Sequence, residues 1–297
     1  MLGAGIALLT SLAWSISSIC IKLVADKFNS LIINTLRTCV GSALLISLIM
    51  VTGRYEAFSH IPWESFVYVI ISGLLAMVIG DTIYIKSVAL LDVSIAFPLS
   101  QCSFILLAVL SAILFLDEHL TWITVTGAIF VVMGIYFMTS SRGLKRGSKE
   151  KKKVHPKGLL FILIAVILWT GATIALKIGV IGVDPVPAAS LRITASAVVL
   201  IFLFFSRTKK GTTSYLWNSN KKNLLLIAAS GLLTYGLAAV GYISAIQWIG
   251  AGKTVLLTAS APLFTLPLSI LILKEKPTRF AILGVIISVL GVCLVVI

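Results

Sequence analysis

The sequence predicts an all-α membrane protein with ten transmembrane helices, arranged as two inverted five-helix repeats. Three observations support this fold class. The 297 residues are 59% hydrophobic and only 11% charged, whereas an ordinary soluble domain carries about 25% charged residues. Ten mainly apolar runs can each cross a bilayer, which takes about 20 residues in a helix. The first five runs also resemble the last five, in the same order.

The predicted spans follow the apolar runs and are separated mostly by short polar connections. They are 2–24, 31–51, 66–86, 93–116, 120–138, 158–178, 185–205, 223–246, 254–273 and 279–297. The strands of a membrane barrel would instead be segments of about ten residues with alternating polarity, and these runs do not alternate. We therefore expect a first repeat over 1–139, a basic linker over 140–157 and a second repeat over 158–297.

The first span is expected to be a retained helix. It has no basic segment before its apolar core, no clear small-residue cleavage site, and an apolar run that is long for a signal peptide. Four prolines fall inside predicted spans: Pro98, Pro187, Pro262 and Pro267. A proline inside a helix frees a backbone carbonyl and kinks the helix. These positions are either packing kinks or functional breaks.

An internal duplication links the two halves. The segment WSISSICIK, from Trp14, matches WTGATIALK, from Trp169, at an offset of 155 residues. The further matches are Leu36-Arg37 with Leu191-Arg192, Ser72 with Ser230, Tyr84 with Tyr242, Glu118 with Glu275, and Gly127 and Gly134 with Gly284 and Gly291. Because each half holds an odd number of helices, the two copies cross the membrane in opposite directions. Such inverted repeats are typical of transporters that work by alternating access.

Positive charge is distributed unevenly between the two sides of the predicted membrane. Of the 24 Lys and Arg residues, 20 lie on the side that carries the linker Arg142–Lys157, which alone holds eight. The positive-inside rule places that side in the cytoplasm and both termini outside. The net charge of +14 is thereby explained by topology, and no basic aromatic surface suggests nucleic-acid binding.

These motifs resemble the drug/metabolite transporter superfamily, in its ten-helix EamA-type branch. The resemblance rests on LAWSISSICIKL and VILWTGATIALKI, which open the two halves, on the acidic turns LDEHLTW and LKEKPTR, and on the glycine pairs. It implies a monomer-capable secondary transporter or exporter of amino acids, other metabolites or drugs. It further implies a central cavity lined by helices one to four and six to nine. The fifth and tenth helices would then be peripheral.

The chain departs from the family pattern in two ways. Small four-helix relatives carry a glutamate in the first helix for proton coupling, and here the first and sixth spans hold no acid. Family members also often have cytoplasmic termini, which conflicts with the charge distribution. A proton or another coupling ion is therefore an open expectation, together with the small-molecule substrate and the lipid bilayer as partners.

Arg37 and Asp81 are ionisable residues within predicted spans, where a charge is costly unless it has a partner or a function. With 1.5 Å of rise per residue, they lie about 9 Å and about 7.5 Å deep from the same side. The sequence favours an Arg37–Asp81 ion pair that locks two helices. The alternative is that the pair opens and Asp81 binds a proton or a cationic substrate.

Arg192 is the repeat mate of Arg37, while Asp81 aligns with Ala239, so the second half has no matching acid. A planar guanidinium suits bidentate recognition of a carboxylate. We expect Arg192 to contact an anionic group of the substrate; the alternatives are that it reaches the outer interface or pairs with Asp184.

Four aromatic residues in matching positions complete the candidate substrate cavity: Trp14, Tyr84, Trp169 and Tyr242. They either line the cavity, where they would suit apolar, aromatic or cationic substrates, or simply pack helices together. Asn34, Gln101 and Gln247 are weaker polar candidates, and Lys22 and Lys177 are expected to reach toward the membrane surface.

Several features are expected to be structural. Glu118 and Glu275 precede the fifth and tenth spans, where an acid stabilises a helix N-terminus. The glycine pairs are spaced seven apart and allow close helix packing. Cys20, Cys39, Cys102 and Cys293 lie in apolar runs without metal spacing.

The sequence shows no hydrolase triad, phosphate loop or zinc motif, and therefore predicts no enzyme, cofactor or metal site. We expect a multi-pass protein of the cell membrane that transports a small metabolite, such as an amino acid or a drug. A non-transporting receptor or scaffold and a membrane-embedded lipid-modifying enzyme are the alternatives.

Overall fold

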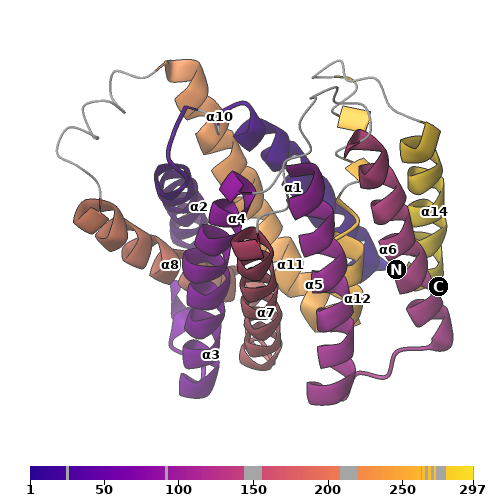
Figure 1. The fold of residues 1–297 in the computed structure, drawn as a ribbon. Coiled ribbons are helices and arrows are strands. Elements are labelled where there is room, and N and C mark those ends of the chain that lie inside the picture. The colour runs from indigo at the N-terminus through magenta and orange to yellow at the C-terminus, as the bar shows by residue number, and fades with distance from the viewer. Residues whose placement is uncertain are drawn as a thin grey trace.

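The computed structural model describes residues 1–24, 27–90, 93–143, 156–207, 220–261, 263–264, 267–268, 271 and 279–296. Every regular element within these ranges is a helix (Figure 1). Six helices are long and apolar enough to cross a membrane, and three shorter apolar helices accompany them. The all-α membrane fold expected from the sequence is confirmed.

The first half begins with α1 (Leu2–Lys22) and α2 (Ser30–Thr52), and a short 3-10 turn, η1 (Arg54–Phe58), follows. The third predicted span consists of three consecutive segments, α3 (Trp63–Gly73), the π-helix η2 (Leu74–Gly80) and α4 (Asp81–Leu90). Two helices, α5 (Val93–Phe115) and α6 (Trp122–Gly143), complete this half.

The second half repeats this order with α7 (Pro156–Gly179) and α8 (Pro185–Arg207). The eighth predicted span is again tripartite, with α10 (Lys221–Gly231), the π-helix η3 (Leu232–Leu237) and α11 (Ala238–Ile249). Then come α12 (Ala251–Thr258) and α14 (Arg279–Val296). The later part of the ninth predicted span and most of the basic linker lie outside the described residues.

Two π-helices at matching positions are a feature that the sequence reading did not anticipate. Both η2 and η3 start directly after the repeated Ser-Gly pair, Ser72-Gly73 in the first half and Ser230-Gly231 in the second. A π-helix widens the helical turn and disturbs the regular ladder of backbone hydrogen bonds, and it occurs frequently at functional sites. The duplication therefore extends to a local backbone irregularity in each half.

Pro187 does not kink its helix. It stands in the first turn of α8, whose first residue is Pro185. The first backbone N–H groups of a helix have no intrahelical acceptor, so a proline there removes no hydrogen bond. The two prolines therefore mark the beginning of the helix.

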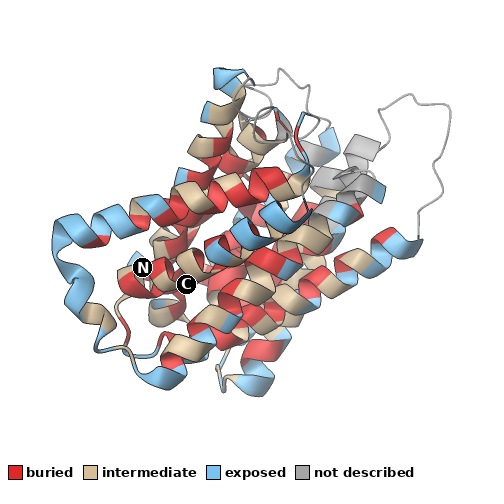
Figure 2. Ribbon diagram, turned by 90° about the vertical axis from the view of Figure 1, so that its left-hand side faces the viewer, coloured by how far each residue is buried: buried red, intermediate tan, exposed pale blue. Residues whose placement is uncertain are grey.

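Glycine contacts between the halves are reciprocal. A Cβ atom built on Gly73 would lie 2.7 Å from the Arg192 carbonyl oxygen, and one built on Gly231 would lie 2.5 Å from the Arg37 carbonyl oxygen. Each glycine thus lets its helix approach the arginine-bearing helix of the other half. The repeat mates α2 and α8 also pack on each other, and Figure 2 shows buried residues running through the interior of the bundle.

The helices α6 and α14 form a closely packed pair at one edge of the molecule (Figure 1). A Cβ on Gly127 would lie 2.7 Å from the Gly291 carbonyl oxygen, and one on Gly134 would lie 2.5 Å from the Gly284 carbonyl oxygen. The glycine pairs therefore pack helices together, as the sequence predicted. Both helices also expose large apolar side chains, such as Trp122 and Phe280, on their outer faces.

Candidate functional site

Asp81 stands where η2 ends and α4 begins, and its carboxyl group contacts two side chains of the second half. Trp169 on α7 donates a hydrogen bond from Nε1 to Asp81 Oδ1 at 3.0 Å. The Tyr235 hydroxyl on η3 lies 3.1 Å from Asp81 Oδ2. The acid at the end of one π-helix thereby meets the phenol of the other. We call Asn34, Arg37, Asp81, Trp169 and Tyr235 the central polar cluster.

Asn34 on α2 connects the two π-helices. Its Nδ2 donates to the backbone carbonyl of Met77 in η2 at 3.0 Å, and its Oδ1 lies 2.9 Å from the Tyr235 hydroxyl. Asn34 and Tyr235 are both buried. The widened turn of η2 therefore receives a side-chain donor, which is how an irregular backbone is tolerated inside a membrane protein.

Arg37 does not form the ion pair with Asp81 that the sequence favoured. Its guanidinium lies over the face of the Tyr235 ring, with Cζ 4.9 Å from the ring centroid. Nη2 donates to Thr234 Oγ1 at 3.1 Å and to Ser17 Oγ at 3.3 Å. The aromatic ring and the two hydroxyl groups take the place of the carboxylate as partners of this cation. Among the residues that the structure describes, the buried Nε of Arg37 has no hydrogen-bond partner.

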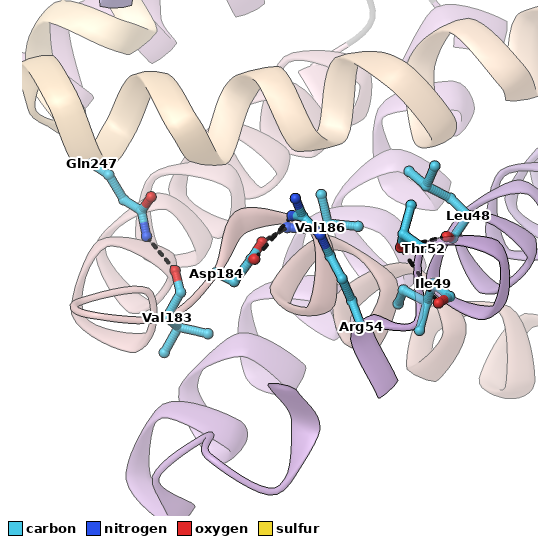
Figure 3. A network of polar contacts seen from close by, with 8 residues as sticks. All are labelled: Leu48, Ile49, Thr52, Arg54, Val183, Asp184, Val186 and Gln247. Atoms are coloured by element: carbon cyan, nitrogen blue, oxygen red, sulfur yellow. Dashed lines mark hydrogen bonds and ion pairs between the residues drawn. The ribbon is translucent and has the colours of Figure 1, made fainter. Parts of the chain in front are cut away.

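Arg192 does not extend to the membrane surface or pair with Asp184, which were the alternatives to substrate contact. The residue is 6% exposed, and its Nε donates to Ser72 Oγ at 3.0 Å. Asp184 instead pairs with Arg54 at 3.0 Å and accepts a hydrogen bond from the Val186 backbone N–H (Figure 3). Within the described ranges, no carboxylate lies within ion-pair distance of Arg192.

The four predicted aromatic residues form two tryptophan–tyrosine pairs, and each pair joins one residue of the first half to one residue of the second. Trp14 lies beside Tyr242, with ring centroids 5.5 Å apart, and Trp169 lies beside Tyr84, with centroids 5.1 Å apart. Each repeat thus supplies the tryptophan of one pair and the tyrosine of the other. The Trp169 pair adjoins Asp81, while Tyr242 shares a hydrogen bond with Thr173 and the indole N–H of Trp14 has no partner.

A second polar group joins the halves at one end of the bundle. Glu118 was expected to stabilise the start of its own following helix, but it caps α12 in the other half instead. Its carboxylate accepts from the Ala251 and Gly252 backbone N–H groups at 2.6 Å and 3.0 Å. Asp117, with a φ of 50°, turns the chain just before it. The expected type of contact is present, but the helix is a different one.

Lys177 and Gln247 belong to the same end. Lys177 does not extend outward as expected: its Nζ donates to the Ile246 carbonyl at 3.1 Å and lies 3.8 Å from Glu118 Oε1. Gln247 Nε2 donates to the carbonyls of Val180 and Val183 at 2.6 Å and 2.7 Å, the second bond being visible in Figure 3. These side chains satisfy the ends of α7 and α11.

Tyr235 is the site residue that sequence reasoning missed. The internal repeat gave no signal for it, because its mate in the first half is Met77. Its polar neighbours Ser17, Thr234 and Ser72 were also overlooked, since single hydroxyls are common in membrane helices. A usable signal was the repeated Ser-Gly-Leu-Leu segment, which continues with Thr234 and Tyr235 in the second half and with Ala76 and Met77 in the first. In the part of the chain that the structure describes, no cluster of metal-ligating residues occurs.

Comparison with known proteins places this arrangement in a family. The model of the EamA-like transporter family matches residues 1–140 and again 156–297. The chain belongs to the EamA-like transporter family. A transporter of uncharacterised function from Archaeoglobus fulgidus is 22% identical over 294 residues, which cover 99% of this chain and 98% of that protein.

Two further comparisons agree with the EamA assignment. The uncharacterised transporter YoaV of Bacillus subtilis is 27% identical over 138 residues, and this match spans 46% of the present chain and 44% of YoaV. A solved crystal structure shares the fold with a TM-score of 0.80 at 17% sequence identity, covering 98% of this chain and 95% of the other. The protein is thus a multi-pass membrane protein of a transporter family.

Proposed function

We propose that this EamA protein is a secondary active transporter that moves a small metabolite across the cell membrane by alternating access. The observation that carries the proposal is the composition of the central polar cluster. Asn34, Arg37 and Asp81 come from the first half, and Trp169 and Tyr235 come from the second. Any movement of one half relative to the other must therefore break and remake these contacts.

The chemistry of the cluster favours an amino acid or a related compound, and an amine-bearing drug is the alternative substrate. The acid, the arginine and the amide of the cluster, together with the buried Arg192 on α8, offer partners for both ends of a zwitterion. The rings of Trp14, Tyr84, Trp169 and Tyr242 offer apolar and cation-binding faces beside them. In this proposal Arg37 and Arg192 attract the substrate's anionic group, and transport is outward.

Uptake into proteoliposomes tests the function directly. Purified protein is reconstituted and supplied with a mixture of radiolabelled amino acids, with protein-free liposomes as the blank. We expect Trp169→Leu to abolish uptake, because it removes the indole donor to Asp81 and the ring beside Tyr84. Trp122→Leu is the matched control, since Trp122 is 86% exposed and lies on α6, a helix that contributes no residue to the cluster.

Uptake that is equal in the Trp169→Leu and Trp122→Leu proteins would show that the central cluster is not the transport site. No uptake of any labelled amino acid by the unaltered protein would exclude this substrate class. A panel of cationic dyes, tested next in the same vesicles, would then decide whether the protein takes amine-bearing drugs.

A further inference from the structure

The contacts around the Tyr235 hydroxyl require one more hydrogen than the side chains hold when Asp81 is ionised. Asn34 donates through Nδ2 to the Met77 carbonyl, which fixes the orientation of its amide. Its Oδ1 therefore faces the Tyr235 oxygen, 2.9 Å away, and can only accept a hydrogen bond. A phenol has one hydrogen to donate, and the Asn34 contact uses it.

The second contact of Tyr235 joins its hydroxyl oxygen to Asp81 Oδ2 over 3.1 Å. Both atoms are oxygens, and the phenol has no hydrogen left for this contact. An ionised carboxylate only accepts, whereas a protonated one carries a single O–H group and keeps an acceptor on its other oxygen. Protonated Asp81 fits both of its contacts. Oδ2–H donates to the Tyr235 oxygen, and Oδ1 accepts from Trp169 Nε1 at 3.0 Å.

We propose that Asp81 carries a proton in this conformation and is the proton-binding group that couples transport to a pH gradient. The inference rests on the transport function proposed above and adds its coupling ion. The acid lies in the third membrane segment, at the end of the π-helix, and is partly exposed. Water can thus deliver and accept the proton when that side of the protein opens.

The charged and titratable groups around Asp81 explain what the proton controls. They are Arg37 on α2, Arg192 on α8, Tyr235 on η3 and Tyr84 on α4, while α7 contributes the indole of Trp169. Among the described residues, no basic nitrogen lies within ion-pair distance of Asp81. The guanidinium of Arg37 lies over the face of the Tyr235 ring, and within the described ranges its Nε has no hydrogen-bond partner.

Loss of the proton changes these contacts in a defined way. The Asp81 O–H bond breaks, the proton passes to water, and both carboxylate oxygens become acceptors. Tyr235 then turns its single hydrogen from Asn34 to Asp81, and the guanidinium of Arg37 is attracted to the new negative charge. To reach it, Arg37 must leave Ser17 on α1 and Thr234 on η3. Proton release therefore alters contacts between the two halves.

Infrared spectroscopy of the reconstituted protein tests the protonation state without a substrate. The chain has only 10 Asp and Glu residues, so the band of a protonated carboxylic acid can be assigned by substituting one of them. We expect a carbonyl band of a protonated carboxylic acid at pH 7 that disappears in Asp81→Asn. The asparagine amide can donate to Tyr235 and accept from Trp169, so this variant keeps the fold.

Tyr235→Phe provides the test of position. If Asp81 donates to the phenol oxygen, removing that oxygen weakens the hydrogen bond and shifts the acid band to higher wavenumber. Tyr68→Phe, on α3 and 37% exposed, is the matched control and leaves the band in place. The absence of a protonated-acid band in the unaltered protein, or its persistence in Asp81→Asn, would overturn the proposal.

Flux measurements separate this inference from the transport function itself. Uptake of the labelled amino-acid mixture is measured with and without an imposed pH gradient, in the unaltered protein and in Asp81→Asn. We expect the gradient to stimulate uptake by the unaltered protein. In Asp81→Asn, whatever uptake remains should be the same with and without the gradient. Uptake that ignores the gradient in the unaltered protein would refute proton coupling while leaving the transport proposal intact.

Discussion

Arg192 is a buried cation whose guanidinium donates a hydrogen bond to a neutral hydroxyl, that of Ser72. A buried charge without an opposite charge is costly, so it is retained where it serves a ligand or a structural need. Its repeat mate Arg37 instead donates to two hydroxyl groups, those of Ser17 and Thr234, and lies over the ring of Tyr235. The two arginines thus occupy equivalent places in the repeat with different surroundings.

Arg192→Gln is expected to weaken the apparent affinity for an anionic or zwitterionic substrate about tenfold or more. A hydrogen bond to a charged group contributes about 1.5–3 kcal/mol, and each 1.4 kcal/mol is about a factor of ten. Concentration-dependent uptake into proteoliposomes measures the effect.

The matched control for this substitution is Arg54→Gln, because the Arg54–Asp184 pair lies at the surface with the arginine side chain 50% exposed. Such pairs contribute about 1 kcal/mol or less, so its uptake should match that of the unaltered protein. Unchanged affinity in Arg192→Gln would assign this arginine a purely structural role.

At the scale of elements, the junction between α11 and α12 depends on one glycine and one acid. Gly250 has a φ of 84°, in the region that residues with a Cβ atom rarely adopt. A Cβ there would also lie 2.6 Å from Glu118 Oε2. The glycine both turns the chain and leaves room for the carboxylate that caps α12.

Gly250→Ala is expected to destabilise the protein by about 1–3 kcal/mol, the usual cost of a strained backbone position. The melting temperature of the purified protein in detergent reports the loss. Gly5→Ala is the control, because a Cβ on Gly5 meets nothing within 4 Å and the residue lies inside α1. Alanine there should be neutral or stabilise by about 0.5–1 kcal/mol, and equal losses in both variants would contradict the strain argument.

Glu118→Gln tests the acid of the same junction. The neutral amide still offers one oxygen, but it loses the charge that favours a helix N-terminus and the attraction to Lys177. We expect a loss of about 0.5–2 kcal/mol, the range for removing a helix cap. Glu56→Gln, in the exposed η1 turn, should leave the melting temperature unchanged. A melting temperature for Glu118→Gln that equals that of Glu56→Gln would show that the cap does not hold α12.

Reciprocal contacts between the two halves hold the whole molecule together. Tryptophan and tyrosine pairs cross from one repeat to the other, the glycine beside each π-helix packs on the arginine-bearing helix of the other half, and α6 packs along α14. Two halves with so many reciprocal contacts form one unit. The orientation of that unit in the membrane rests on its charge distribution.

An epitope tag inserted at Ser148 should be reachable only from the cytoplasm, because the linker side carries most of the positive charge. Antibody labelling of intact and permeabilised cells measures this. A tag at His60, in the exposed turn before α3, is the complementary control and should be labelled in intact cells. The reverse pattern would invert the topology and leave the fold unchanged.

Much of the architecture was predictable because it depends on composition and repetition. Apolar runs of about 20 residues must be helices in a bilayer, since every backbone polar group has to be satisfied internally. The repeated Trp14 and Trp169 segments identified the duplication, and the glycine pairs indicated close helix packing, which the structure places between α6 and α14. The candidate residues Asp81, Arg37 and Arg192 followed from the cost of burying a charge.

The partners of those residues were decided only by the tertiary structure. The positions of Arg37 and Asp81 in their predicted spans put both residues at a similar depth in the membrane. Depth alone does not give the direction of a side chain or what lies between two helices. Tyr235, brought in from the other half by the π-helix η3, contacts both members of the expected ion pair, Arg37 through its ring and Asp81 through its hydroxyl. Likewise, Glu118 caps α12 because chain ends from both halves converge there. The sequence alone determined which buried polar and charged groups need a partner. The packing of the two halves decided which neighbouring residues serve as those partners.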